Sequence, residues 1–151
     1  MKLTYREIEL EPSTVEDNRE YLLKLAIQDK FNRTDLDKLT DGLKLIRYIW
    51  VGRANGVRGG IVFICFIPSL NFWTLDAYKE DHALRLVNTQ GDFSFRAATL
   101  VIDWFFKTHA EDLYTIHRVE NRGATIVCKR LGFEIVAEYS DFVTLRKAYG
   151  T

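Results

Sequence analysis

The chain has 151 residues, of which 47% are hydrophobic and 13% aromatic, a composition that excludes intrinsic disorder and predicts a single folded domain over residues 1–151. Its 21 basic and 21 acidic residues cancel, so no overall charge favours nucleic acid or an anionic membrane as a partner. The longest apolar run, residues 61–67, is too short to span a bilayer, and Arg6 and Glu7 interrupt the place where an export signal needs its apolar region, so we expect a cytoplasmic protein without membrane contact.

The N-terminal third predicts one strand and two helices. Residues 2–10 alternate in polarity as a strand does, with one slip in phase, and Pro12 ends the run. Ser13 and Glu16 have the S-x-x-E spacing of a capping box, which predicts a helix over residues 14–31. A second run of apolar residues at helical spacing predicts a helix over 34–46.

The next segment predicts a β-hairpin followed by another strand. Asn55-Gly56 is a strong signal for a two-residue turn, because both residues tolerate a positive φ. The second arm is apolar at every position from 61 to 67, as expected for a central strand that is covered on both faces. We expect the further strand over 71–79 and an irregular polar segment over 80–93.

The C-terminal part predicts a helix over 94–110, whose wide apolar surface suits either the core or a docking face. A strand over 112–119 leads directly into a helix over 121–133, which Asn121 can cap at its start and Gly132 can end in the left-handed conformation. An antiparallel pair of strands that turns near Ser140-Asp141 completes the chain.

The resulting order, β-α-α-β-β-β-α-β-α-β-β, predicts an α/β fold with a single mixed central sheet flanked by helices. This order resembles that of the GNAT superfamily of N-acetyltransferases. Members often carry, near the C-terminus, Asn-x-x-Ala/Ser, four residues to a Tyr, and then x-x-Leu-Gly-Phe. The residues that match this motif here are Asn121, Ala124, Leu131, Gly132 and Phe133.

The resemblance implies that acetyl-CoA is the cofactor and that Asn121 and Ala124 lie beside it. The family holds the pyrophosphate with Gln/Arg-x-x-Gly-x-Gly/Ala at a helix N-terminus, where backbone N–H groups and the helix dipole favour negative charge. The matching residues here are Gly91, Asp92, Phe93 and Ser94.

This cradle departs from the family pattern. Asn88 stands in place of Gln or Arg, Asp92 adds a negative charge, and Phe93 replaces a small residue and would crowd the phosphates. Arg85 and Arg96 could compensate in part. Alternatively, Asp92 or Ser94 simply caps a core helix.

The candidate catalytic residues also depart from the family. Cys128 occupies the position of the Tyr that protonates the leaving thiolate in many members, and its thiol could donate that proton or could be a small core residue. Candidate general bases are Asp76, Glu80 and His117, which are alternatively solvated strand-end charges and a half-exposed strand residue. We expect Cys65 and Cys128 to be reduced.

The three histidines show no metal-ligand spacing, so we expect no metal site. Two functions are then consistent with the sequence. The first is an acyl-CoA-dependent N-acyltransferase that acts on an amine acceptor. The second is a non-catalytic protein, because the chain also loosely resembles small GNAT-like proteins of tailed bacteriophages that are linked with head assembly or the virion. Such a protein would act through a protein partner or as a homo-oligomer, in the host cytoplasm or the virion.

Overall fold

A computed structural model describes residues 1–29, 36–80 and 93–150. The elements, in chain order, are β1 (Leu3–Tyr5), β2 (Ile8–Pro12), α1 (Val15–Gln28), α2 (Leu36–Leu43), β3 (Ile46–Ala54), β4 (Val57–Ile67), β5 (Phe72–Lys79), α4 (Phe93–Thr108), β6 (Leu113–Arg118), α5 (Arg122–Arg130), β7 (Glu134–Glu138) and β8 (Phe142–Lys147).

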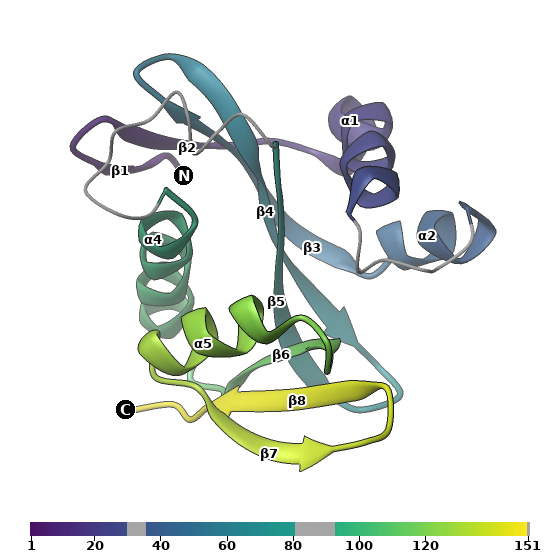
Figure 1. Cartoon of the computed structure of the whole chain (residues 1–151). Helices are drawn as coiled ribbons and strands as arrows, with labels where there is room; N and C mark the ends of the chain where they lie inside the picture. The colour runs from purple at the N-terminus through teal and green to yellow at the C-terminus, as the bar shows by residue number, and fades with distance from the viewer. Residues whose placement is uncertain (30–35, 81–92, 151) are drawn as a thin grey trace.

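The strands form one mixed eight-stranded sheet in the order β1-β2-β3-β4-β5-β6-β8-β7. All neighbouring strands are antiparallel except β5 and β6, which are parallel. Helices α4 and α5 lie on one face of this sheet, and α1 and α2 lie on the other (Figure 1). The predicted single mixed sheet flanked by helices is therefore confirmed.

Each face of the sheet has its own hydrophobic core. The core under α4 and α5 includes three completely buried residues from β2, α4 and β6, namely Leu10, Phe105 and Leu113. The core under α1 includes Leu22 and Phe63. The wide apolar surface of α4 belongs to the first core, because partly buried residues such as Trp104 pack against it.

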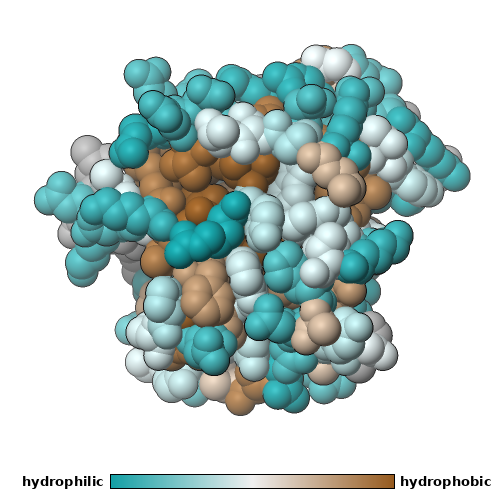
Figure 2. Space-filling model, turned by 180° about the vertical axis from the view of Figure 1, so that it is seen from behind, coloured by the Kyte–Doolittle hydropathy of each residue, from teal (hydrophilic) through white to brown (hydrophobic). Residues whose placement is uncertain are grey.

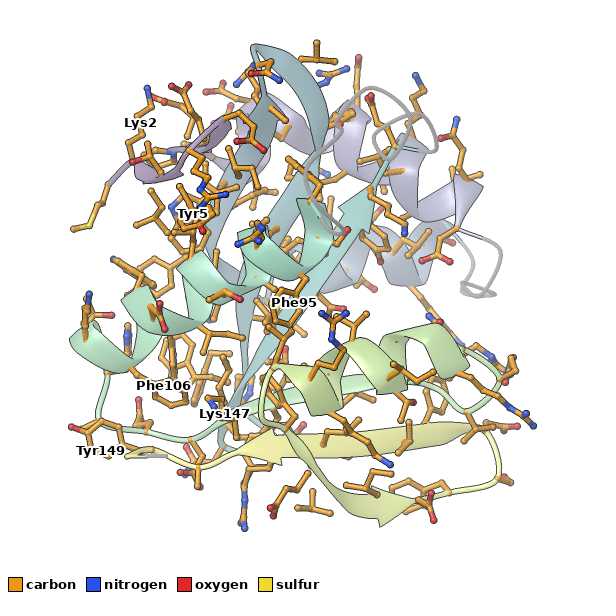
Figure 3. The ribbon with its side chains drawn as sticks, turned by 60° about the vertical axis from the view of Figure 1, so that its left-hand side comes forward. Lys2, Tyr5, Phe95, Phe106, Lys147 and Tyr149 are labelled. Atoms are coloured by element: carbon orange, nitrogen blue, oxygen red, sulfur yellow. The ribbon has the colours of Figure 1, made fainter. Side chains whose placement is uncertain are left out.

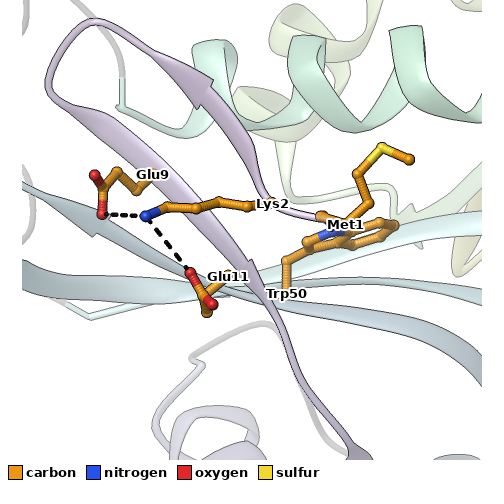
Figure 4. Close-up of polar contacts among 5 residues, drawn as sticks. All are labelled: Met1, Lys2, Glu9, Glu11 and Trp50. Carbon is orange, nitrogen blue, oxygen red and sulfur yellow. Dashed lines mark hydrogen bonds and ion pairs between the residues drawn. The ribbon is translucent and has the colours of Figure 1, made fainter.

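The first strand predicted from the sequence is in fact two strands. β1 and β2 form an antiparallel hairpin in which Leu3 pairs with Leu10, and Arg6 takes a φ of 53° at the turn. The phase slip in the sequence marks this turn, which lacks the usual Gly or Asn signal. Lys2 forms ion pairs across the hairpin with Glu9, at 3.4 Å, and with Glu11, at 3.8 Å (Figure 4).

The predicted capping box at the start of α1 is wrong by one residue. Thr14 is the N-cap, and its hydroxyl accepts a hydrogen bond from the Asp17 backbone N–H at 3.1 Å. The Ser13 hydroxyl instead accepts a hydrogen bond of 2.7 Å from the Asn18 side-chain amide. Two hydroxyl residues in succession made either cap chemically reasonable.

The second helix ends earlier than the apolar spacing predicts. α2 stops at Leu43, and Ile46 starts β3, because its side chain belongs to the core under α1. The turn between β3 and β4 is confirmed, since Asn55 and Gly56 both have positive φ values, of 52° and 79°. None of the helices in the described part of the chain is long and apolar enough to cross a membrane.

Candidate functional site

The central feature of the sheet is the separation of β5 from β6. These parallel strands pair at only two positions, Trp73 with Leu113 and Thr74 with Tyr114, whereas β5 pairs with β4 along its whole length. Beyond Thr74, one edge of β5 therefore has no partner strand among residues 1–29, 36–80 and 93–150. Its backbone N–H and C=O groups there are available to a ligand that can pair as a strand would.

Asp76 lies on β5 just past the point of separation. It is paired with Phe63 of β4 and so faces the side of the sheet that carries α1 and α2. Burial, together with the nearby charge of Asp29, raises the pKa of the Asp76 carboxyl from its ordinary value of 3.8 to about 7. A carboxyl with this pKa exchanges protons near neutral pH, as a general base must.

Cys128 lies on α5, on the opposite side of the sheet from Asp76, and packs against the core under α4 and α5. Its sulfur accepts a hydrogen bond from the Thr115 hydroxyl of β6 at 3.6 Å. Burial raises the pKa of the Cys128 thiol, and the charge of Asp76 raises it further. The structure therefore brings two of the predicted catalytic residues close enough for one charge to affect the other.

Glu80, the second candidate base, is held in a different arrangement. Its carboxylate is 3.6 Å from Arg58 Nε, and its backbone N–H donates to the Gly59 carbonyl at 2.9 Å. The Arg58 guanidinium also lies over the ring of Tyr21, 3.7 Å from its centre. The Glu80 side chain is only 13% exposed, so it is not the solvated strand-end charge of the alternative reading.

His117, the third candidate base, is half-buried on β6 and shares a hydrogen bond of 2.7 Å with the Thr125 hydroxyl of α5. Burial lowers its pKa, which keeps the ring neutral at pH 7. This contact places His117 on the α5 side of the sheet, away from Asp76. The structure therefore does not group the three candidate bases.

Phe93 begins α4, and its ring lies in the core rather than in a phosphate cradle. The side chain is 4% exposed and fills the space beside two glycines of the β3–β4 hairpin. A Cβ atom built on Gly59 would be 2.9 Å from the ring, and one built on Gly52 would be 3.0 Å from it. The ring is therefore accommodated inside the fold by these glycines, and whether it crowds bound phosphates stays a prediction.

The rest of the predicted cradle is only partly visible. Gly91 and Asp92 lie outside the described residues. Ser94 lines a small cavity of about 30 Å³ between the first turns of α4 and the end of β5, together with the small side chains of Ala77, Ala97 and Ala98.

Two guanidinium groups flank the first turn of α4. Arg96 lies over the ring of Tyr5, 4.9 Å from its centre, and Arg130 of α5 lies over the ring of Phe95 at 4.6 Å. Figure 3 shows Tyr5 on one side of α4 and Phe95 between α4 and α5. Sequence reasoning missed Arg130, since a basic residue at the end of a helix is common for reasons unrelated to a ligand.

Asn121 and Ala124 form the start of α5 as predicted. The Asn121 side-chain oxygen accepts a hydrogen bond of 3.2 Å from the Ala124 backbone N–H, which confirms the N-cap. Gly132 has a φ of 97°, which confirms the left-handed end of this helix. Whether Asn121 and Ala124 also contact a cofactor stays a prediction.

The side of the molecule opposite α5 has a hollow of its own. Figure 2 shows this side, where a hollow with hydrophobic walls opens within a hydrophilic rim. Asp76 belongs to the same face of the sheet. The two faces at the β5–β6 separation are thus distinct, since α5 with Cys128 packs on one and α1 with α2 packs on the other.

No family model and no curated protein matches the sequence. Solved structures do match. An acetyltransferase from Agrobacterium tumefaciens has a TM-score of 0.74 at 15% identity, over 97% of this chain and 94% of its own. A GNAT-family acetyltransferase from Bacillus anthracis has a TM-score of 0.69 at 10% identity, over 100% of both chains.

Two further structural neighbours have named acceptors. RimL, a ribosomal L7/L12 alpha-N-protein acetyltransferase, has a TM-score of 0.68 at 12% identity over 98% of both chains, and its coenzyme A is joined to a cysteine by a disulfide. A variant of spermidine N-acetyltransferase SpeG from Vibrio cholerae has a TM-score of 0.68 at 13% identity, over 95% of this chain and 94% of its own. The chain therefore has the GNAT acyl-CoA N-acyltransferase fold.

Proposed function

We propose that this protein is an acyl-CoA-dependent N-acyltransferase that transfers an acetyl group to an amine. The observation that carries the proposal is the placement of Asp76 and Cys128 on the two faces of the sheet near the separation of β5 and β6, where the charge of Asp76 acts on the Cys128 thiol. A catalyst of this transfer needs a proton acceptor on the side of the amine and a proton donor on the side of the leaving sulfur. The overall likeness to N-acetyltransferases supports the reading.

The described residues fit acetyl-CoA at two places. The unpaired edge of β5 offers backbone groups to the amides of the pantetheine arm. The first turn of α4, with Arg96 and Arg130 beside it, suits the pyrophosphate. When bound, acetyl-CoA supplies an acetyl group activated as a thioester.

Asp76 takes a proton from the ammonium group of the acceptor, so that the free amine can form the new C–N bond, and the further proton that the nitrogen loses as the amide forms passes to solvent. A pKa of about 7 leaves a large share of Asp76 ionised at neutral pH while keeping it basic enough for this step. Cys128 holds the proton that the sulfur needs when the C–S bond breaks, because its raised pKa keeps the thiol protonated.

The two proton transfers assist each other. The negative charge of Asp76 raises the pKa of Cys128, so this charge opposes loss of the thiol proton. Once Asp76 has taken the proton of the acceptor, its charge is gone and Cys128 becomes the stronger acid. Uptake of one proton therefore prepares the release of the other.

The first experiment is thermal unfolding with and without 1 mM acetyl-CoA, with ATP at the same concentration as the control. At about 100 times the dissociation constant, a ligand adds about 2.7 kcal/mol to the free energy of unfolding. For a chain of this size we expect Tm to rise by roughly 5–10 °C. No rise, or an equal rise with ATP, contradicts the proposal.

Turnover is measured as the release of free thiol from acetyl-CoA. Spermidine and a peptide with a free N-terminal amine are the acceptors to try first, because neighbours of this fold act on these two classes. Cys128→Ala should reduce the rate by about 100-fold or more, the usual contribution of a general acid. The matched control is Cys65→Ala, which removes the other cysteine, on the α1 side of the sheet.

Cys128 can also be tested by covalent capture. In RimL a cysteine forms a disulfide with coenzyme A. If Cys128 lies at the sulfur of the cofactor, its thiolate should attack the disulfide form of coenzyme A, releasing one coenzyme A thiolate and retaining the other in a mixed disulfide. Mass spectrometry should then find one added coenzyme A on Cys128 and none on Cys65.

The alternative, a non-catalytic protein of phage head assembly or of the virion, stays a prediction, since no feature of the described residues favours it. The same unfolding experiment separates the two functions. A chain that acts only through protein surfaces gains no stability from acetyl-CoA.

A further inference from the structure

The contact between Thr115 and Cys128 joins the middle of β6 to the last turn of α5. Thr115 is 6% exposed and lies one residue past the last pair that β6 forms with β5. Its hydroxyl donates to the sulfur at 3.6 Å, an ordinary distance for sulfur because of its large radius. The sulfur of a neutral thiol is a weak acceptor.

The direction of this hydrogen bond matters for chemistry. Because the sulfur accepts from Thr115, the S–H proton of Cys128 is not used in the contact and remains available to another acceptor. If Cys128 loses that proton, the same hydrogen bond becomes stronger, since an ionised sulfur is the better acceptor. Thr115 therefore both orients the thiol and stabilises the thiolate that proton donation would leave behind.

We propose that Thr115 is a positioning residue that holds the Cys128 thiol ready to donate its proton to the leaving sulfur of the acyl donor. The proposal rests on the proposed function and assigns a role to a residue outside the family motif. In the balanced step, the proton passes from Cys128 to the thiolate that leaves when the C–S bond breaks. Cys128 is then a thiolate that accepts from Thr115, until it regains a proton from solvent.

The charged and titratable groups around Cys128 are few among the described residues. Asp76 of β5 acts against the thiolate. His117 is on β6 with Thr115 and is held by Thr125, and Lys129 and Arg130 of α5 are exposed. Thr115 is the group whose hydrogen bond favours the thiolate.

A purely structural role for Thr115 must also be tested, because the contact helps to fix α5 on β6. The chain offers a matched control, since the His117–Thr125 hydrogen bond fixes the same helix on the same strand one turn earlier. Thr125→Val removes that second contact and leaves Cys128 untouched. Thr115→Val removes the first contact with little change in volume, and Thr115→Ser retains the hydroxyl.

The first readout needs no cofactor. All variants are made with Cys65→Ala, so that Cys128 is the single cysteine, and the rate of alkylation by iodoacetamide is measured against pH. Hydrogen bonds to ionised groups are strong enough to shift a pKa by about one unit or more. We expect Thr115→Val to move the midpoint upward by roughly one pH unit, and Thr115→Ser and Thr125→Val to leave it in place.

The second readout is acetyl transfer with Cys65→Ala as the reference. Thr115→Val should lower kcat about 10-fold with little change in KM, and Thr115→Ser should restore most of it. The proposal is overturned if Thr115→Val leaves the midpoint unchanged or if Thr125→Val reproduces its effects on the midpoint and on kcat. If the midpoint of alkylation moves as expected but acetyl-CoA does not bind, the proposed function is wrong, whereas the effect of the Thr115 hydrogen bond on the Cys128 thiol is confirmed.

Discussion

The ring of Phe93 occupies the space that a side chain at Gly59 would need. A Cβ atom on Gly59 would lie 2.9 Å from two carbons of that ring, closer than side chains pack. The two residues come from α4 and from β4, so this contact fixes the start of the helix against the hairpin. Phe93 is thus a structural residue at the border of the proposed cofactor site.

Phe93→Ala should lower the free energy of unfolding by about 3–5 kcal/mol, the usual cost of removing a buried phenylalanine. It should not tighten the binding of acetyl-CoA, because the ring is not in the way. Urea unfolding gives the stability, and calorimetry gives the affinity. A stable Phe93→Ala variant that binds acetyl-CoA more tightly would show that the ring does obstruct the cofactor site.

Gly59→Ala should destabilise the protein by about 1–3 kcal/mol, because the new methyl group overlaps the ring of Phe93. In the background of Phe93→Leu, the same change should cost less, since the smaller side chain leaves room. Gly56→Ala is a poor control, because Gly56 has a positive φ, so Gly42→Ala, which meets nothing within 4 Å, serves instead. Equal costs in the two backgrounds would show that the overlap is not with Phe93.

Asp76 should make stability depend on pH. Its folded pKa, about 7, lies above its ordinary value, so between about pH 4 and pH 7 the folded protein binds more protons than the unfolded chain. The contribution of Asp76 to stability is therefore present at low pH and is lost as pH rises through 7. Asp76→Asn should stabilise the protein at pH 8 by about 2–4 kcal/mol and have little effect at pH 4. Equal effects at both values would contradict the raised pKa.

The same residue should set the pH profile of acetyl transfer. Asp76 is a base only when ionised, so kcat/KM should rise about 10-fold for each unit of pH below 7 and level off above it. Asp76→Asn should remove this rise and lower the rate at pH 8 by about 100-fold. Glu80→Gln, which changes the carboxylate paired with Arg58, should leave the profile in place.

Asn121 offers a test that separates folding from binding. Asn121→Ala should cost about 1 kcal/mol, because the Ala124 N–H loses its partner, whereas Asn121→Asp retains a capping oxygen. If Asn121 also faces acetyl-CoA, the added charge of Asn121→Asp should weaken binding while Tm stays near that of the wild type. If Asn121→Asp binds acetyl-CoA with unchanged affinity, the role of Asn121 is only that of the N-cap of α5.

The sequence predicts most of the fold, because local signals and the fold agree over most elements. Short local signals predict three features correctly, namely the Asn55-Gly56 turn, the buried strand β4 and the Asn121 cap. The β1–β2 turn was not predicted from the sequence, because Arg6 takes a positive φ that is uncommon for an arginine. Which of two hydroxyls caps α1 was likewise undecided by local chemistry.

The candidate site was less predictable, because it depends on contacts between distant segments. Asp76 looked like a strand-end charge, and its high pKa comes from burial and from Asp29, which is far away in sequence. From the sequence, Phe93 was expected to obstruct the phosphates, because nothing local shows that Gly52 and Gly59 make room for its ring. The hydrogen bond from Thr115 had no signal in the sequence at all.

The sheet is joined less extensively between β5 and β6 than elsewhere, because these strands pair at only two positions. Strands β1 to β5 form one continuous plate, and β6 to β8 form a second, and the plates share a seam only two rows wide. The hydrogen-bonded ladders within each plate are independent of those within the other. Among the described residues, the connection between the two parts of the sheet therefore rests on these two pairs and on α4, which packs against strands of both parts.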